Sequence, residues 1–343
     1  MGNYYLSKNY KGINDAGNKA KTDIERIMRD LGFQNAGLPQ TFCKNKIAGF
    51  FLTLAGVLKV PFTVSKGDIL VLQYPLKKFY PFVCRMARLR GCKVVTLIHD
   101  LGSFRRKKLT VPQEISKLNG SDVLIVHNEY MKQWLLEQGY TKPMVCLEIF
   151  DYLSDTVARD QQEPDSVYKV TYAGGLSYKK NRFIYDVDSL TRSWSFYLYG
   201  GGFESDRIVN KELFVYKGFI PSDQLIATAE GDFGLVWDGE SPFTCTGAFG
   251  EYLQYNNPHK TSLYIRCHLP VVVWEKAAIA SFVKNNNIGI CVDSLEHLDR
   301  ILASVSKEQY HIMKTNILRI SEQLASGFYT QKALAKADSY LKG

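Results

Sequence analysis

Apolar runs of strand length alternate with helical patterns along the first half of the chain. A short strand at 3–6 is followed by a helix with Ile24, Ile27, Met28 and Leu31 on one face, ending near Gly32. Further strands are predicted at 69–73, 93–98, 123–126 and 144–147, and further helices at 78–90 and 129–138. Strands that alternate with helices of this length indicate βαβ units and a parallel sheet.

The alternation stops in a polar segment, 155–166, and then begins again. Strands are predicted at 168–172, 194–199, 213–216, 232–237 and 271–274, and helices at 222–229, 260–267 and 328–341. The polar segment is the best linker candidate, and Gly327 is a candidate hinge before the last helix. The pattern therefore predicts a first domain at 1–158, a second domain at 167–326, and a C-terminal helix at 327–343. With 343 residues, the chain is long enough for two cores.

Composition narrows the class of protein. Hydrophobic residues make up 45% and charged residues 22% of the chain, as in a soluble globular protein. The net charge of +9 favours acidic partners, namely nucleotides, anionic lipid surfaces or nucleic acid. Nucleic acid is not expected, because no recognisable binding module is present. The seven scattered cysteines form no C-x-x-C pair, and residues 1–10 have no apolar core, so we expect a reduced, cytoplasmic protein without a zinc site.

One apolar run, 47–58, lies between Lys44 and Lys46 on one side and Lys59 on the other. It is too short to span a bilayer. One interpretation is a core helix with solvated lysines. The other is a helix lying in the interface of an anionic membrane, which its basic flanks and the aromatic and basic stretch 74–90 favour.

The strand 94–98 ends directly in His99 and Asp100. Open α/β sheets bind ligands at the carboxyl ends of their strands, and both side chains can take a proton from an attacking hydroxyl group. Basic residues flank this pair at 85–93 and 105–108, so an anionic partner is expected nearby. The alternative is that Asp100 caps the next turn and His99 has no chemical role.

The polar loop 7–18 follows the first strand at the same expected edge of the sheet. Its last residues, Gly17 and Asn18, are candidates for binding a ligand. A plain surface connection is the alternative for each of them.

Two features of the second half favour phosphate binding. Gly174 and Gly175 follow a strand and precede Lys179, Lys180 and Arg182; paired glycines let a ligand approach the backbone, and the basic side chains can meet phosphate oxygens. Later, Lys260 lies in the first turn of a predicted helix, whose free amides and positive dipole end also suit a phosphate. The alternative is an ordinary βαβ segment with a solvated lysine.

Other motifs refine this hypothesis. Gly218, Phe219 and Ile220 offer main-chain amides and an aromatic face to a nucleobase. No G-x-G-x-x-G opens the first helix and no G-x-x-x-x-G-K-[ST] is present, which disfavours a dehydrogenase or a P-loop enzyme.

Together, these motifs resemble a GT-B glycosyltransferase. The stretch 233–237, followed by Lys260, Ser262, Tyr264 and the segment 270–273, is similar to bacterial galactofuranosyltransferases and to the glucosyltransferases that extend GlcNAc on streptococcal serine-rich adhesins. The resemblance implies two Rossmann-like domains and no need for a metal. The second domain holds a UDP-sugar with Lys260 and Ser262, and the first holds the acceptor, for which Gly17 and Asn18 are the candidates. The resemblance also implies that the final helix crosses back onto the first domain.

The chain departs from many retaining GT-B enzymes at three positions. Tyr255 and Leu263 stand where those enzymes carry two glutamates, and His268 replaces a glycine. We therefore expect an inverting transfer of a hexose with Asp100 or His99 as the base. The expected partners are a nucleotide sugar, a glycan or lipid-linked acceptor, an anionic membrane surface and a second copy of the chain. A non-catalytic subunit that binds nucleotide sugars is the alternative.

Overall fold

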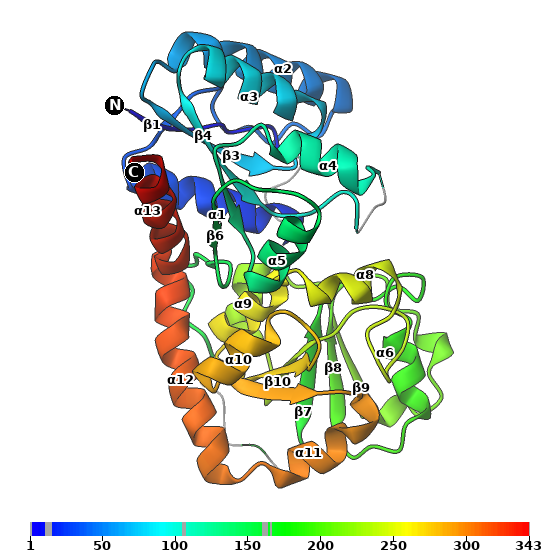
Figure 1. The fold of residues 1–343 in the computed structure, drawn as a ribbon. Helices are drawn as coiled ribbons and strands as arrows, with labels where there is room; N and C mark the ends of the chain where they lie inside the picture. The colour runs from blue at the N-terminus through cyan, green and yellow to red at the C-terminus, as the bar shows by residue number, and fades with distance from the viewer. Residues whose placement is uncertain (1, 11–15, 105–107, 160–163, 165–166, 343) are drawn as a thin grey trace. The chain divides into compact units, whose positions relative to one another are not determined.

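The computed structural model describes residues 2–10, 16–104, 108–159, 164 and 167–342. The chain folds into two compact units, which are described separately below. Unit 1 contains residues 1–151 and 327–343, and unit 2 contains residues 152–326. Both are α/β units built on six-stranded parallel sheets (Figure 1).

Unit 1 has the strand order β2-β1-β3-β4-β5-β6. Its strands are β1 (Asn3–Tyr5), β2 (Gln34–Asn35), β3 (Ile69–Tyr74), β4 (Lys93–Ile98), β5 (Val123–Val126) and β6 (Met144–Cys146). Its helices are α1 (Ala16–Asp30), α2 (Lys46–Thr63), α3 (Tyr80–Leu89), α4 (Val111–Leu118), α5 (Glu129–Glu137) and α13 (Phe328–Lys342). The order of the strands reverses between β1 and β3, so the carboxyl ends of these two strands flank the crevice where such sheets bind ligands.

Unit 2 has the strand order β12-β11-β10-β7-β8-β9. Its strands are β7 (Lys169–Ala173), β8 (Ser195–Tyr199), β9 (Phe214–Gly218), β10 (Phe233–Val236), β11 (Val271–Trp274) and β12 (Gly289–Val292). Its helices are α6 (Phe183–Asp186), α7 (Ser222–Thr228), α8 (Gly247–Glu251), α9 (His259–Arg266), α10 (Ala280–Asn286), α11 (Leu298–Ser304) and α12 (Lys307–Ser326). This is the Rossmann order, and its switch point lies between β7 and β10.

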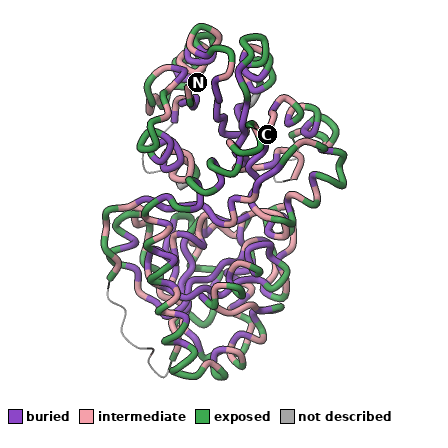
Figure 2. The backbone as a smooth tube through the Cα atoms, turned by 60° about the vertical axis from the view of Figure 1, so that its left-hand side comes forward, coloured by how far each residue is buried: buried purple, intermediate pink, exposed green. Residues whose placement is uncertain are grey.

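The central strands form the cores of both sheets. Every residue of β3, β5, β10 and β11 is buried, which explains why these strands are apolar, apart from Gln73, rather than alternating. Figure 2 colours the buried backbone of both units purple. The strands β4, β5 and β11 have the bounds that the sequence predicts, or differ from them by one residue.

The last helix, α13, belongs to unit 1, where it contacts β5, β6 and α1. Its first turn is capped by the buried carboxylate of Asp151, which accepts hydrogen bonds from the backbone amides of Tyr329 (3.1 Å) and Thr330 (2.6 Å). Gly327 precedes it with φ of 76°, and a Cβ there would lie 2.7 Å from a side-chain carbon of Ile27. A glycine is therefore needed at this turn.

The division between the units falls after Asp151, earlier than the predicted linker. Tyr152 already packs in unit 2: its amide donates to the carbonyl of Leu324 (3.1 Å), and its ring stacks on His259. Residues 160–163 and 165–166 of the predicted linker lie outside the described residues.

Candidate functional site

Three glycine-containing strand exits meet at one edge of the unit 2 sheet. The amide of Gly174 donates to the carbonyl of Tyr199 (2.9 Å), and the amide of Gly200 donates to that of Gly218 (2.8 Å). A Cβ at Gly200 would lie only 1.7 Å from the carbonyl oxygen of Gly174. The backbones therefore pack without side chains between them, so a ligand can approach the main chain closely at this edge.

Lys180 folds back over this glycine turn. A Cβ built on Gly175 would lie 3.3 Å from the ammonium nitrogen of Lys180. The turn is held by Asn181, which is fully buried: its amide donates to the carbonyl of Gly175 (2.7 Å), and its carbonyl oxygen accepts from the amide of Gly239 (3.4 Å). Asn181 thus links the exits of β7 and β10 and fixes a cation above paired glycines, an arrangement suited to a phosphate.

Lys179 and Arg182, predicted for the same task, lie differently. Both are exposed, and Arg182 donates to the carboxylate of Asp186 (3.0 Å) and lies 5.8 Å from the ring centroid of Tyr178. The structure therefore brings Lys180 to the glycine turn, and gives Lys179 and Arg182 no contact with it among the described interactions.

Lys260, at the start of α9, reaches the switch point between β7 and β10. Its ammonium donates to the carboxylate of Asp238 (2.9 Å), to the carbonyl of Trp237 (3.2 Å) and to the hydroxyl of Tyr172 (3.0 Å), whose ring centroid is 4.1 Å away. Burial lowers the pKa of Lys260, the Asp238 carboxylate opposes this shift, and the charge of Lys180 adds to it. The lysine is thus neither solvated nor unpaired: its three protons have acceptors within unit 2.

The other predicted donor residues divide by exposure. Ser262 is fully buried in α9. Phe219 is 65% exposed, next to Gly218 with φ of 77°, and Ile220 is half-buried. An exposed ring at the exit of β9 is compatible with the predicted stacking on a base.

His268 occupies a backbone conformation suited to glycine. It follows α9 with φ of 56°, in the left-handed region. The position where many retaining GT-B enzymes carry glycine therefore keeps glycine geometry here, although the side chain differs.

In unit 1, His99 and Asp100 follow β4 at the carboxyl edge of the sheet, and both are half-buried. The Nε2 atom of His99 lies 2.6 Å from the side-chain oxygen Oε1 of Gln73, and its ring stacks on Phe150. The Gln73 amide group donates to the carbonyl of Lys21 (3.1 Å), which orients the glutamine oxygen toward His99. Because this glutamine oxygen can only accept a hydrogen bond, Nε2 of His99 is the donor in this contact.

A buried carboxylate that sequence reasoning missed orders the loop after this pair. Glu114 accepts hydrogen bonds from the amides of Gly102 (2.7 Å) and Ser103 (2.8 Å) and from the hydroxyl of Tyr74 (2.9 Å). These contacts join α4, β3 and the loop behind Asp100. Tyr74 and Glu114 are 40 residues apart, so no local pattern signals their pairing.

The prediction for Gly17 and Asn18 was wrong in one respect. Helix α1 begins at Ala16, so both residues lie in its first turn and not in a loop. Their carbonyls accept from Lys21 (3.2 Å) and Thr22 (3.4 Å) in the following turn. Residues 11–15 of the predicted loop lie outside the described residues.

A second missed carboxylate lies between α1 and the exit of β1. Glu25 is buried and accepts from the hydroxyl groups of Ser7 (2.7 Å) and Tyr10, and from the amide of Gln40 (3.3 Å). Burial raises the pKa of Glu25 to about 7, against the hydrogen bonds of Tyr10 and Ser7. Among the described residues, no group of three or more His, Cys, Asp or Glu side chains could hold a metal ion.

Comparisons with known proteins agree with this architecture. Family models described as the N-terminal and the C-terminal domain of glucosyltransferase 3-like proteins match residues 3–149 and 170–337. The chain is 32% identical to the beta-1,6-galactofuranosyltransferase WbbI of Escherichia coli K12, over 99% of both chains. It is 25% identical to glucosyltransferase 3 of Streptococcus gordonii, over 93% of this chain and 92% of that one.

Solved structures show the fold. Anabaena Alr3699/HepE, in complex with UDP, has a TM-score of 0.63 at 12% identity and covers 99% of this chain and 100% of its own. The lipopolysaccharide outer core galactosyltransferase WaaB has a TM-score of 0.60 at 13% identity, covering 98% and 99%. Both units of this chain are thus matched, and the protein is a glycosyltransferase of the GT-B fold that belongs to the glucosyltransferase 3-like family.

Proposed function

We propose that the protein transfers a hexose (galactofuranose, galactose or glucose) from a UDP-sugar to a hydroxyl group of a glycan or glycolipid in bacterial surface polysaccharide or glycoprotein assembly. The named activities of the two relatives support galactofuranose and glucose. The observation that carries the donor assignment is the Lys180 ammonium above Gly175 at the β7–β10 switch point.

In this proposal the diphosphate lies on the glycine turn. The acceptor oxygen attacks the anomeric carbon, the bond from that carbon to the diphosphate breaks, and negative charge develops on the departing UDP. Lys180 and the amides of the glycine turn stabilise this charge. Lys260 adds positive charge to this site, and its ion pair holds the Asp238 carboxylate in place.

His99 or Asp100 receives the proton of the acceptor hydroxyl group. Within unit 1, Gln73 and Phe150 orient the ring of His99, and Glu114 fixes the loop that follows Asp100, so both side chains are held in place. Tyr255 and Leu263 stand where many retaining enzymes carry glutamates, which supports inversion. Fixed lysine and amide charges replace a divalent cation in this scheme, so the reaction is metal-independent.

We place the reaction in the cytoplasm, at the inner face of the membrane. All seven cysteines lie in described residues and are free thiols, as expected in a reducing compartment. A lipid-linked acceptor fits this location. Sedimentation velocity tests whether the chain also associates with a second copy of itself.

The rival hypothesis is a non-catalytic subunit that binds nucleotide sugars. The substitutions Asp100→Ala and His99→Gln distinguish the two. If one of these residues is the base, its substitution lowers turnover by about a hundredfold or more, while the affinity for UDP in calorimetry is retained. If the wild type and both variants bind UDP equally and none turns over, the non-catalytic reading is correct.

A further inference from the structure

Helix α2 in unit 1 presents its large apolar side chains to solvent. Its buried residues are mostly small: Gly49, Gly56, Val57 and Val60. Its exposed apolar residues, with the exposed fraction of each, are Ile47 (71%), Phe51 (60%), Leu58 (48%) and Phe62 (88%). The spacings of four, seven and four residues place them on one side of the helix. An ordinary surface helix has the opposite arrangement, so this face is built to contact something apolar.

The helix lies on the domain and does not leave it. The carbonyls of Ala36 and Gly37 accept hydrogen bonds from Thr63 (3.2 Å) and Lys59 (3.3 Å), and a Cβ at Gly56 would lie 3.4 Å from the Leu38 amide. The 18 residues of α2 exceed the predicted apolar run, and by length and composition the helix could cross a membrane, with 22% of that window buried. Its hydrogen bonds to the preceding loop favour a helix that lies flat in an interface instead.

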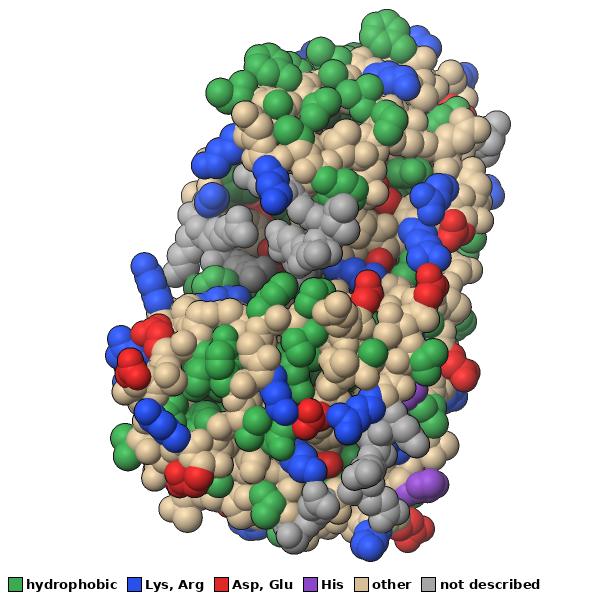
Figure 3. All heavy atoms as spheres, turned by 180° about the vertical axis from the view of Figure 1, so that it is seen from behind, with side chains coloured by type: hydrophobic (Ala, Val, Ile, Leu, Met, Phe, Trp, Pro, Cys, Tyr) green, Lys and Arg blue, Asp and Glu red, His purple; other side chains and the backbone are tan. Residues whose placement is uncertain are grey.

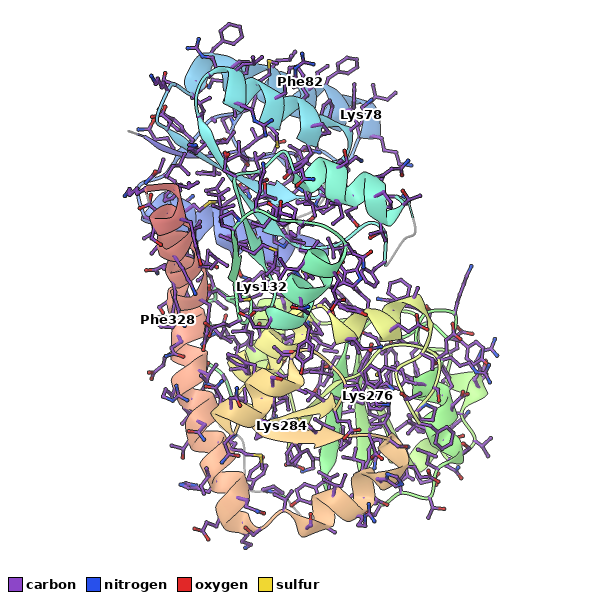
Figure 4. All side chains as sticks on the ribbon, in the orientation of Figure 1. Lys78, Phe82, Lys132, Lys276, Lys284 and Phe328 are labelled. Atoms are coloured by element: carbon purple, nitrogen blue, oxygen red, sulfur yellow. The ribbon has the colours of Figure 1, made fainter. Side chains whose placement is uncertain are left out.

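Helix α3 extends the apolar face. It packs beside α2 and exposes Phe82 (38%) and Leu89 (71%). Figure 4 labels Phe82 and Lys78 on this side of unit 1, and Figure 3 shows hydrophobic side chains gathered over these helices at the top of the view, with Lys and Arg around them. We call this surface, formed by 44–63 and 77–90, the α2–α3 face.

The charge of the α2–α3 face has one sign. The two segments contain eight basic residues and no aspartate or glutamate: Lys44, Lys46, Lys59, Lys77, Lys78, Arg85, Arg88 and Arg90. The ammonium of Lys78 lies 4.5 Å from the ring centroid of Phe50, which places this charge at the border of the apolar stripe. Aromatic and basic side chains in this arrangement match the headgroup region of an anionic bilayer.

The positive charge of the α2–α3 face also decides between two possible partners, a second copy of the chain and a lipid bilayer. In a symmetric dimer, the same face of both copies would meet, and eight positive charges would oppose eight others without a carboxylate in either segment. Lipid headgroups supply the missing negative charge. We propose that the α2–α3 face is an in-plane anchor that binds the surface of an anionic lipid bilayer, with Phe51 and Phe62 inserted below the headgroups.

The anchor rests on the proposed function only in that a lipid-linked acceptor would be met at a membrane. The test of the anchor measures lipid binding and does not use turnover. The full chain is sedimented with vesicles of phosphatidylcholine alone or mixed with phosphatidylglycerol. We expect binding only to the mixed vesicles, weakened by added salt. Changing Lys44, Lys46 and Lys59 to Glu should lower the partition coefficient by at least about a hundredfold.

A second variant tests the apolar stripe. Phe51→Ser with Phe62→Ser should lose binding with no change in the melting temperature, because both side chains are exposed. Matched controls lie outside the face: Lys276→Glu with Lys284→Glu in unit 2, and Phe328→Ser in α13 (Figure 4). Both controls should sediment like the wild type.

Several results would overturn the anchor. One is a wild-type chain that ignores anionic vesicles at low salt. Another is equal loss of binding in the control variants, which would indicate attraction by overall charge. A third is a wild-type chain that does not bind vesicles but forms a dimer in sedimentation velocity, when the double variant Phe51→Ser with Phe62→Ser is monomeric. That result would assign the face to a second copy. UDP release with a soluble acceptor is measured separately, so failure of the anchor leaves the proposed transferase standing.

Discussion

The ammonium of Lys260 lies 2.9 Å from a carboxylate oxygen of Asp238, and this ion pair joins the start of α9 to the exit of β10. The two side chains are 14% and 20% exposed, so water screens the pair weakly. The hydroxyl of Tyr172 donates to the same carboxylate (3.0 Å). Lys260 therefore stabilises the switch point of unit 2, independently of any contribution to donor binding.

Replacing Lys260 with Ala should reduce the free energy of unfolding by about 2–3 kcal/mol, because it leaves a largely buried carboxylate without its cation. We also expect weaker UDP binding. Urea unfolding and calorimetry measure the two effects, and Asp238→Asn is the matched control that loses the pair but keeps the ammonium. Unchanged UDP affinity in Lys260→Ala would make the role of this lysine purely structural.

The neighbours Lys179 and Lys180 give a sharper test of the donor site. Lys180→Ala should weaken UDP binding by about 1.5–3 kcal/mol, the value of a charge-assisted hydrogen bond to a phosphate. The exposed Lys179 is the neighbouring residue and carries the same charge, so Lys179→Ala should leave the affinity for UDP unchanged. Equal losses in both variants would mean that overall charge, not the glycine turn, attracts the nucleotide.

The strands of both sheets could be predicted from sequence because buried parallel strands are continuous apolar runs. The two features predicted to bind phosphate, Gly174 and Lys260, both lie near β7 in the structure: Gly174 follows this strand, and the Lys260 ammonium donates to Tyr172 within it. The strands β2 and β12 were not predicted, because they are only two and four residues long and β2 contains no apolar residue. The helix α12 was not predicted either.

The buried polar residues of the site could not be predicted. Glu25, Glu114 and Asn181 lie on helices or loops where a polar residue is usually solvated, and distant partners decide their burial. Asn181, for example, accepts from an amide 58 residues later. Asp238 did have a local signal, because it directly follows a predicted strand.

Glu25 should make the stability of unit 1 depend on pH. The pKa of Glu25 is about 7 in the folded protein against an ordinary value of 4.5, so between these values the folded state holds the proton more tightly. Its contribution is fully present below pH 4.5 and is lost as pH rises through 7, by up to about 3 kcal/mol. Glu25→Gln should flatten this slope in urea unfolding between pH 5 and 8. The exposed Glu137→Gln serves as control, and a wild-type slope in Glu25→Gln would assign the pH dependence to other groups.

Turnover should survive EDTA. The proposed leaving-group stabilisation uses Lys180, Lys260 and backbone amides, and the described residues contain no cluster that could hold a metal ion. UDP release is measured before and after dialysis against the chelator. Full loss of activity, restored by Mn²⁺ or Mg²⁺, would contradict the metal-independent scheme.

The most direct test of the proposed transferase is UDP release from a panel of UDP-sugars. The panel contains UDP-galactofuranose, UDP-galactose and UDP-glucose, with UDP-N-acetylglucosamine as a control donor outside the proposed set. Each is incubated with wild type, Lys180→Ala and Asp100→Ala, with bacterial glycolipid and soluble glycan acceptors. We predict that the wild type releases UDP from at least one of the three hexose donors, that release requires acceptor, and that Lys180→Ala slows it. UDP binding without release from any donor would contradict the account.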